Sequence, residues 1–84
     1  MKKTINTREA KILSEMLYQL RVSSGLRQSD LARLLKEPQS FVSKVESGER
    51  RLDLVELRTF VRCLKSNLVE FTAELEKRIN ESSK

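Results

Sequence analysis

Apolar residues recur along this chain at intervals of three and four positions rather than two. This spacing predicts α-helices, because it places the apolar side chains along one face of a helix, whereas a strand would show strict alternation. The chain has only two glycines and one proline to interrupt the pattern. The sequence therefore predicts an all-α protein.

Five helices are expected. The first begins after Asn6, which can form a capping box with Glu9, and it ends at Gly25. Its apolar face comprises Ile12, Leu13, Met16, Leu17 and Leu20. The second covers about residues 28–35. Leu31, Leu34 and Leu35 are expected to point inward there, and the small Ala32 leaves room for a neighbouring helix.

The third helix is expected over residues 39–47, with Pro38 at its entry and Gly48 at its end. Val42 and Val45 form its inward face. The fourth opens at a capping box of Asp53 and Glu56. Its apolar positions are Leu54, Leu57, Phe60, Val61 and Leu64. A similar signal at Asn67 and Glu70 opens a fifth helix, to about residue 80, with Leu68, Phe71, Leu75 and Ile79 at near-heptad spacing.

Length and charge restrict the number of domains and the kinds of partner. The chain has 84 residues, enough for one domain over 1–84: a four-helix core at about 6–66 and the C-terminal helix at 67–80. Residues 1–66 carry 14 basic and 8 acidic side chains, net +6, and residues 67–84 carry 3 and 4, net −1. A basic field of this kind fits a nucleic-acid partner, but it also fits an ordinary solvated surface.

Missing residue types argue against most enzyme classes. The chain has no histidine and one cysteine, so it offers no His-based acid–base pair, no Cys–His nucleophile and no usual zinc ligand set. We expect no catalysis, no metal and no cofactor. No stretch of ten residues is continuously apolar, so neither a signal peptide nor a membrane span is predicted, and the cytoplasm is the expected location.

The most specific motif joins the second and third helices, which are short and separated by a three- or four-residue turn, as in a helix-turn-helix. From Gln28 it reads QSDLARLLKEPQSFVSKVESG. This segment resembles the Cro/C1-type (Xre) helix-turn-helix family over about residues 20–64. The likeness is carried by a glutamine at the start of each helix, by Ala32, by the apolar residues Leu31, Leu35, Val42 and Val45, and by Glu46 and Gly48.

The resemblance implies a compact five-helix, lambda-repressor-like DNA-binding domain. It implies base contacts from the third helix by Gln39, Ser40, Ser43 and Lys44, with Gln39 suited to adenine. Gln28 would contact a phosphate and brace Gln39. Further phosphate contacts would come from Arg27, Ser47, Arg50 and Arg51. Arg21 and Glu46 would form an internal, structural ion pair. Taken singly, each polar residue could equally be part of a solvated surface.

Two positions depart from the family pattern. Lys36 stands in the turn where glycine is usual, at a cost of roughly 1 kcal/mol if its backbone is left-handed; otherwise the turn itself differs. Arg27 stands where serine or threonine commonly caps the second helix. Tyr18 and Cys63 are expected to pack in or beside the core.

The expected function is that of a bacterial or phage transcription regulator, a repressor that binds a palindromic double-stranded operator as a dimer. Residues 67–80 are the candidate dimer element, although packing of this helix onto its own core explains Leu68 and Phe71 equally well. Two alternatives stay open. The chain could be the antitoxin of a toxin–antitoxin pair, or a protein-interaction module that does not read DNA.

Overall fold

The computed structural model describes residues 7–82. Five helices follow one another: α1 (Arg8–Ser23), α2 (Gln28–Leu35), α3 (Gln39–Ser47), α4 (Leu54–Cys63) and α5 (Leu68–Ser82). No strand occurs among residues 7–82. The all-α prediction is confirmed, and the bounds of α2 and α3 are those expected from the sequence.

Side-chain caps define where several helices begin. Thr7 caps α1, because its hydroxyl accepts from the Ala10 N–H at 3.1 Å; the expected cap, Asn6, lies outside the described residues. The capping box of α4 is complete. Asp53 Oδ1 accepts from the Glu56 N–H at 2.7 Å, and Glu56 Oε1 accepts from the Asp53 N–H at 2.9 Å. At α5, Asn67 Oδ1 accepts from the Glu70 N–H at 2.9 Å.

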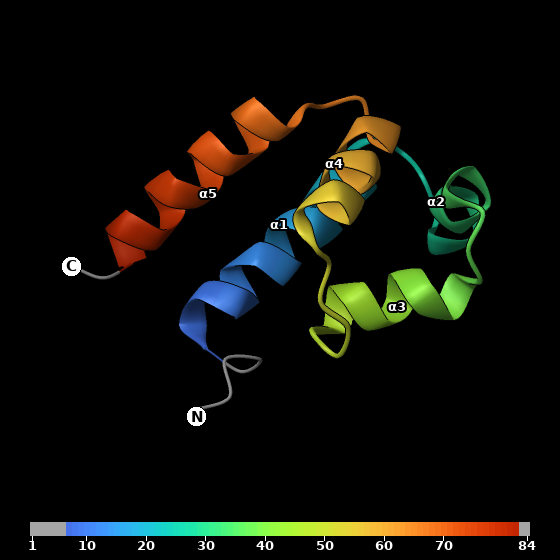
Figure 1. Ribbon diagram of the computed structural model, residues 1–84, viewed down its shortest axis with the longest axis horizontal. Helices are drawn as coiled ribbons and strands as arrows, with labels where there is room; N and C mark the ends of the chain where they lie inside the picture. The colour runs from blue at the N-terminus through green and yellow to red at the C-terminus, as the bar shows by residue number, and fades with distance from the viewer. Residues whose placement is uncertain (1–6, 83–84) are drawn as a thin grey trace.

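The helices pack around one apolar core. α1 packs against α3 and α5, α2 against α3 and α4, and α4 against α5, so that α2 and α3 form the end of the molecule away from the C-terminus of α5 (Figure 1). Every helix contributes to the core, whose buried members are Met16, Leu17, Leu31, Ala32, Val42, Val45, Leu57, Phe60, Val61, Leu64 and Phe71. Cys63 packs against this core, as expected.

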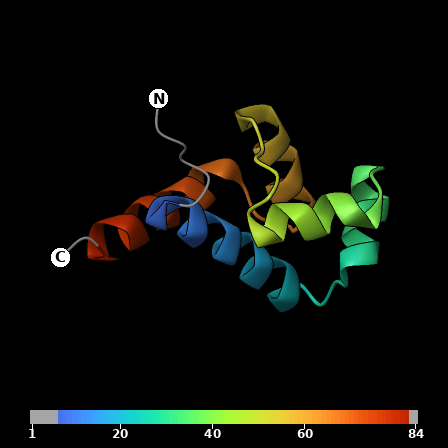
Figure 2. The same ribbon diagram turned by 90° about the horizontal axis from the view of Figure 1, so that it is seen from below.

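Three apolar or aromatic side chains lie further out than predicted. Leu34 is 56% exposed because the buried face of the two-turn α2 is narrow and is filled by Leu31, Ala32 and the partly buried Leu35. Leu54 is 66% exposed, since the first turn of α4 projects beyond the neighbouring helices (Figure 2). Tyr18 is 49% exposed, and the Arg21 guanidinium lies 5.5 Å from its ring centroid.

α5 runs antiparallel beside α1 (Figures 1 and 2). Phe71 is buried, and Leu68 and Leu75 pack against the core. The end of α5 is joined to α1 through Arg8 Nε, which donates to Ser82 Oγ at 3.1 Å. The apolar face of α5 therefore packs against the rest of its own domain. None of the helices in residues 7–82 is long and apolar enough to cross a membrane.

Lys36 ends α2 in the left-handed conformation, with φ 59° and ψ 43°. Its Cβ crowds the following carbonyl there, which lowers the stability of the folded state by roughly 1–2 kcal/mol. Glycine would avoid this contact, but its more flexible unfolded chain would lower the free energy of unfolding by about 0.4–1 kcal/mol. We expect Lys36→Gly to raise the free energy of unfolding by about 0.5–1 kcal/mol in urea denaturation. Lys36→Ala keeps the Cβ and should change little. A Lys36→Gly variant no more stable than Lys36→Ala would argue against strain at this turn.

Candidate nucleic-acid interface

The helix-turn-helix consists of α2, α3 and the turn at residues 36–38. The turn is closed by the Glu37 N–H, which donates to the Ala32 carbonyl at 2.9 Å. α3 is held by Val42 and Val45, both almost fully buried. Because these two lie on one face, the opposite face of α3 is left to solvent. Its exposed polar side chains are Gln39, Ser40, Ser43, Lys44 and Ser47.

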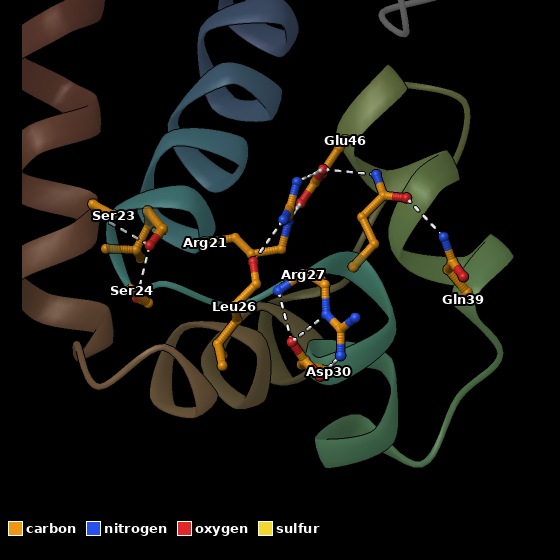
Figure 3. A network of polar contacts seen from close by, with 10 residues as sticks. Arg21, Ser23, Ser24, Leu26, Arg27, Asp30, Gln39 and Glu46 are labelled. Carbon is orange, nitrogen blue, oxygen red and sulfur yellow. Dashed lines mark hydrogen bonds and ion pairs between the residues drawn. The ribbon is translucent and has the colours of Figure 1, made fainter.

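A buried ion pair connects α1 to the end of α3 (Figure 3). Arg21 Nε donates to Glu46 Oε2 at 2.6 Å, and Arg21 Nη2 donates to Glu46 Oε1 at 3.1 Å. Arg21 Nη1 also donates to the Leu26 carbonyl at 2.7 Å. The hydrogen bonds to Glu46 raise the pKa of Arg21 above its ordinary value, against the opposing effect of burial. The two side chains are only 10% and 5% exposed, so the pair fixes α3 relative to α1.

Gln28 extends this network to the exposed face of α3. Its Nε2 donates to Glu46 Oε1 at 3.0 Å, and its Oε1 accepts from Gln39 Nε2 at 3.3 Å. Gln39 is thus held at the first position of α3, beside the start of α2. Sequence reasoning anticipated the pairing of the two glutamines but missed the contact of Gln28 with Glu46. No local pattern signals it, since the residues are 18 positions apart and meet only when α2 packs on α3.

Arg27 is hydrogen-bonded to Asp30 at the start of α2. Its backbone N–H donates to Asp30 Oδ2 at 2.9 Å, and its Nε donates to the same oxygen at 3.2 Å. The pKa of Asp30 is lowered to about 2, mainly by the hydrogen bond from the Arg27 guanidinium and secondly by the hydrogen bond from the Arg27 backbone N–H. In return, the hydrogen bond to Asp30 raises the pKa of Arg27. An arginine side chain has no acceptor, so Asp30, not Arg27, supplies the capping interaction at this end of α2.

The two arginines after α3 differ in their surroundings. The Arg50 guanidinium donates to Glu56 at 3.0 Å, lies 4.8 Å from the Phe41 ring centroid, and donates to the backbone carbonyl of Arg51. Arg51 itself is exposed. Ser47 Oγ is hydrogen-bonded to the Lys44 carbonyl at 3.1 Å and to Glu49 at 3.2 Å. Of the two arginines, only Arg50 has an acidic partner within residues 7–82, so the Arg51 guanidinium is the more available to an anion from solvent.

A family model described as helix-turn-helix matches residues 17–71. The solved structure of an XRE-family-like protein from Pseudomonas syringae pv. tomato is similar over 89% of this chain and 92% of its own, with a TM-score of 0.81 and 37% identity. The chain therefore belongs to the Cro/C1-type (XRE) family of helix-turn-helix DNA-binding transcription regulators.

Other solved structures share the fold. A single-substitution variant of the restriction-modification controller protein C.Esp1396I is 25% identical, with a TM-score of 0.76, over 94% of this chain and 95% of its own. The same controller protein, as a tetramer with its natural 35 base-pair operator, is 24% identical with a TM-score of 0.78, over 88% and 97%. No curated protein matches the sequence.

Proposed function

We propose that this chain represses transcription by binding a palindromic operator, with α3 in the major groove. The observation that carries the proposal is the exposed polar face of α3, whose first residue, Gln39, is held in place by Gln28 at 3.3 Å. A helix-turn-helix presents the N-terminal side chains of its second helix to base edges. The similarity to a restriction-modification controller protein supports a role in regulation.

The residues on this surface divide into two groups. Gln39, Ser40, Ser43 and Lys44 are proposed to contact bases, because all four are exposed on the outer face of α3. Gln28, Arg27, Ser47, Arg50 and Arg51 are proposed to contact phosphates, which position the protein without carrying sequence information. Among the arginines, Arg51 should contribute most, because Arg27 and Arg50 each have an acidic partner within the domain.

A dimer is part of the proposal, because one recognition helix reads only a few base pairs and two half-sites lie about 34–36 Å apart. The inner face of α5 packs on its own domain. A dimer contact through residues 67–80 would therefore use the outer face of α5, where Val69 is 78% exposed. Association through this face would also bury apolar surface that the small domain leaves in water.

Selection of bound sequences from a random duplex pool, at near-physiological salt, tests the function. We expect enrichment of a two-fold symmetric site whose half-sites are one helical turn apart. Enrichment of an asymmetric site would contradict the dimer. A folded protein that enriches nothing would contradict operator binding and favour a protein-interaction module, while a requirement for a second protein would favour an antitoxin.

Gln39→Ala is expected to weaken preference at one base position of the selected site by about 1–3 kcal/mol, because a bidentate amide contact is lost. The measurement is the affinity for the selected duplex and for its three single-base variants at each position. Arg51→Ala is the control, since loss of a phosphate contact should weaken all duplexes alike and reduce the salt dependence. Equal effects of the two substitutions on every duplex would contradict the division into base and phosphate contacts.

A further inference from the structure

The Glu46 carboxylate can only accept hydrogen bonds, and three donors converge on it. Two come from Arg21 and the third from Gln28 Nε2 at 3.0 Å. Because an ionised carboxylate has no proton to donate, Gln28 has to direct its amide nitrogen, rather than its oxygen, at Glu46. The orientation of the Gln28 amide is thereby fixed.

That orientation is passed on to Gln39. With its nitrogen at Glu46, Gln28 directs its oxygen toward α3, where it accepts from Gln39 Nε2 at 3.3 Å. A carbonyl oxygen also only accepts, so Gln39 has to direct its own nitrogen toward Gln28. One N–H and the Oε1 of Gln39 then remain for a base, in a fixed order.

We infer that Glu46 is a positioning residue for DNA sequence preference: acting through Gln28, it fixes the orientation of the Gln39 amide and so favours adenine over guanine at the base that Gln39 contacts. The inference rests on the proposed function, in which α3 reads operator DNA. The buried ion pair then has a second role beyond joining α1 to α3.

The chemistry of the two purines explains why orientation matters. In the major groove adenine presents an acceptor, N7, and a donor, the 6-amino group, whereas guanine presents two acceptors, N7 and O6. An amide held in one order supplies one donor and one acceptor, which matches adenine. At guanine the Gln39 oxygen would face an acceptor in either orientation of the amide. It avoids this only by rotating so that both of its N–H groups point at N7 and O6, which gives up its bond to Gln28. When Glu46 no longer fixes Gln28, less is lost by that rotation, so guanine is accepted more readily.

The test compares duplexes with adenine or guanine at the base position that Gln39→Ala identifies. The main variant is Arg21→Met with Glu46→Met, which removes both charges together and so avoids leaving an unpaired buried ion. We expect the double variant, shown folded by circular dichroism and thermal melting, to lose about fivefold or more of the native preference for adenine over guanine. Preferences at the other base positions should stay within about twofold, because Val42 and Val45 still hold α3 against the core and no bond of those side chains is altered.

A purely structural role for Glu46 predicts a different result, in which affinity falls for all duplexes and the ratio of adenine to guanine binding stays near native. A folded double variant with that behaviour would overturn the inference while leaving the proposed function intact. Failure of the native protein to select any sequence would instead overturn the proposed function itself. If the double variant does not fold, Glu46→Gln decides. Its amide oxygen can still accept from Arg21, but its amide group can either donate to Gln28 or accept from it, so the Gln28 amide is no longer fixed. An unchanged adenine preference in this variant would overturn the inference, and its loss would support it.

Discussion

Replacing Arg21 by methionine is expected to lower the free energy of unfolding by about 3–5 kcal/mol. The Glu46 side chain is only 5% exposed. Of the three hydrogen bonds that its carboxylate accepts from Arg21 and Gln28, the substitution removes the two from Arg21 and leaves the one from the Gln28 amide. Since domains commonly have only about 5–15 kcal/mol of stability, the variant should be close to unfolding at ordinary temperatures. Urea denaturation at neutral pH measures the change.

Two further variants show whether this loss comes from an unpaired buried charge. Arg78→Met removes a half-exposed arginine that pairs with Glu74 at 2.8 Å along α5 and donates to Gln19 Oε1 at 3.0 Å on α1. It should cost no more than about 1 kcal/mol. Arg21→Met combined with Glu46→Met should recover most of the stability lost in the single variant. An Arg21→Met protein as stable as Arg78→Met would show that the pair does not hold α3 against α1.

The prediction of helix-turn-helix bounds succeeded where local chemistry determines the chain path. Pro38 precedes α3, and Gly48, with φ 87°, ends it; neither signal depends on tertiary contacts. The start of α1 was predicted with Asn6 as the cap. Asn6 and Thr7 are adjacent, and either residue type can cap a helix, so the local sequence does not choose between them. The structure shows Thr7 as the cap.

Periodicity was less informative about exposure. It identifies the apolar face of a helix, but it does not tell how far the neighbouring helices extend along that face. Leu54 follows the apolar repeat of α4 and is still 66% exposed, because it lies in the first turn.

Contacts between residues far apart in sequence were the least predictable part of the site. The family resemblance implied the approach of Arg21 to Glu46 and of Gln28 to Gln39. It did not indicate that Gln28 Nε2 bonds to Glu46 and so connects the two pairs. That bond requires the packing of α2 on α3, and it determines the order of donor and acceptor that Gln39 presents.

The second large effect is expected in the apolar core. Phe60 has no exposed surface and lies on α4, which packs against α2 and α5. Phe60→Ala removes the ring and leaves a cavity that the surrounding helices can fill only in part. We expect a loss of about 3–5 kcal/mol in the free energy of unfolding, measured in urea.

Val55→Ala is the matched control for Phe60→Ala, because Val55 lies on the same helix and is 73% exposed. A truncation there removes little buried surface and should change stability by no more than about 0.5 kcal/mol. The contrast between the two variants measures which face of α4 is turned toward the core. Similar losses at both positions would mean that α4 is rotated relative to α2 and α5. Residues of α4 other than Phe60 would then pack against α2 and support the helix-turn-helix.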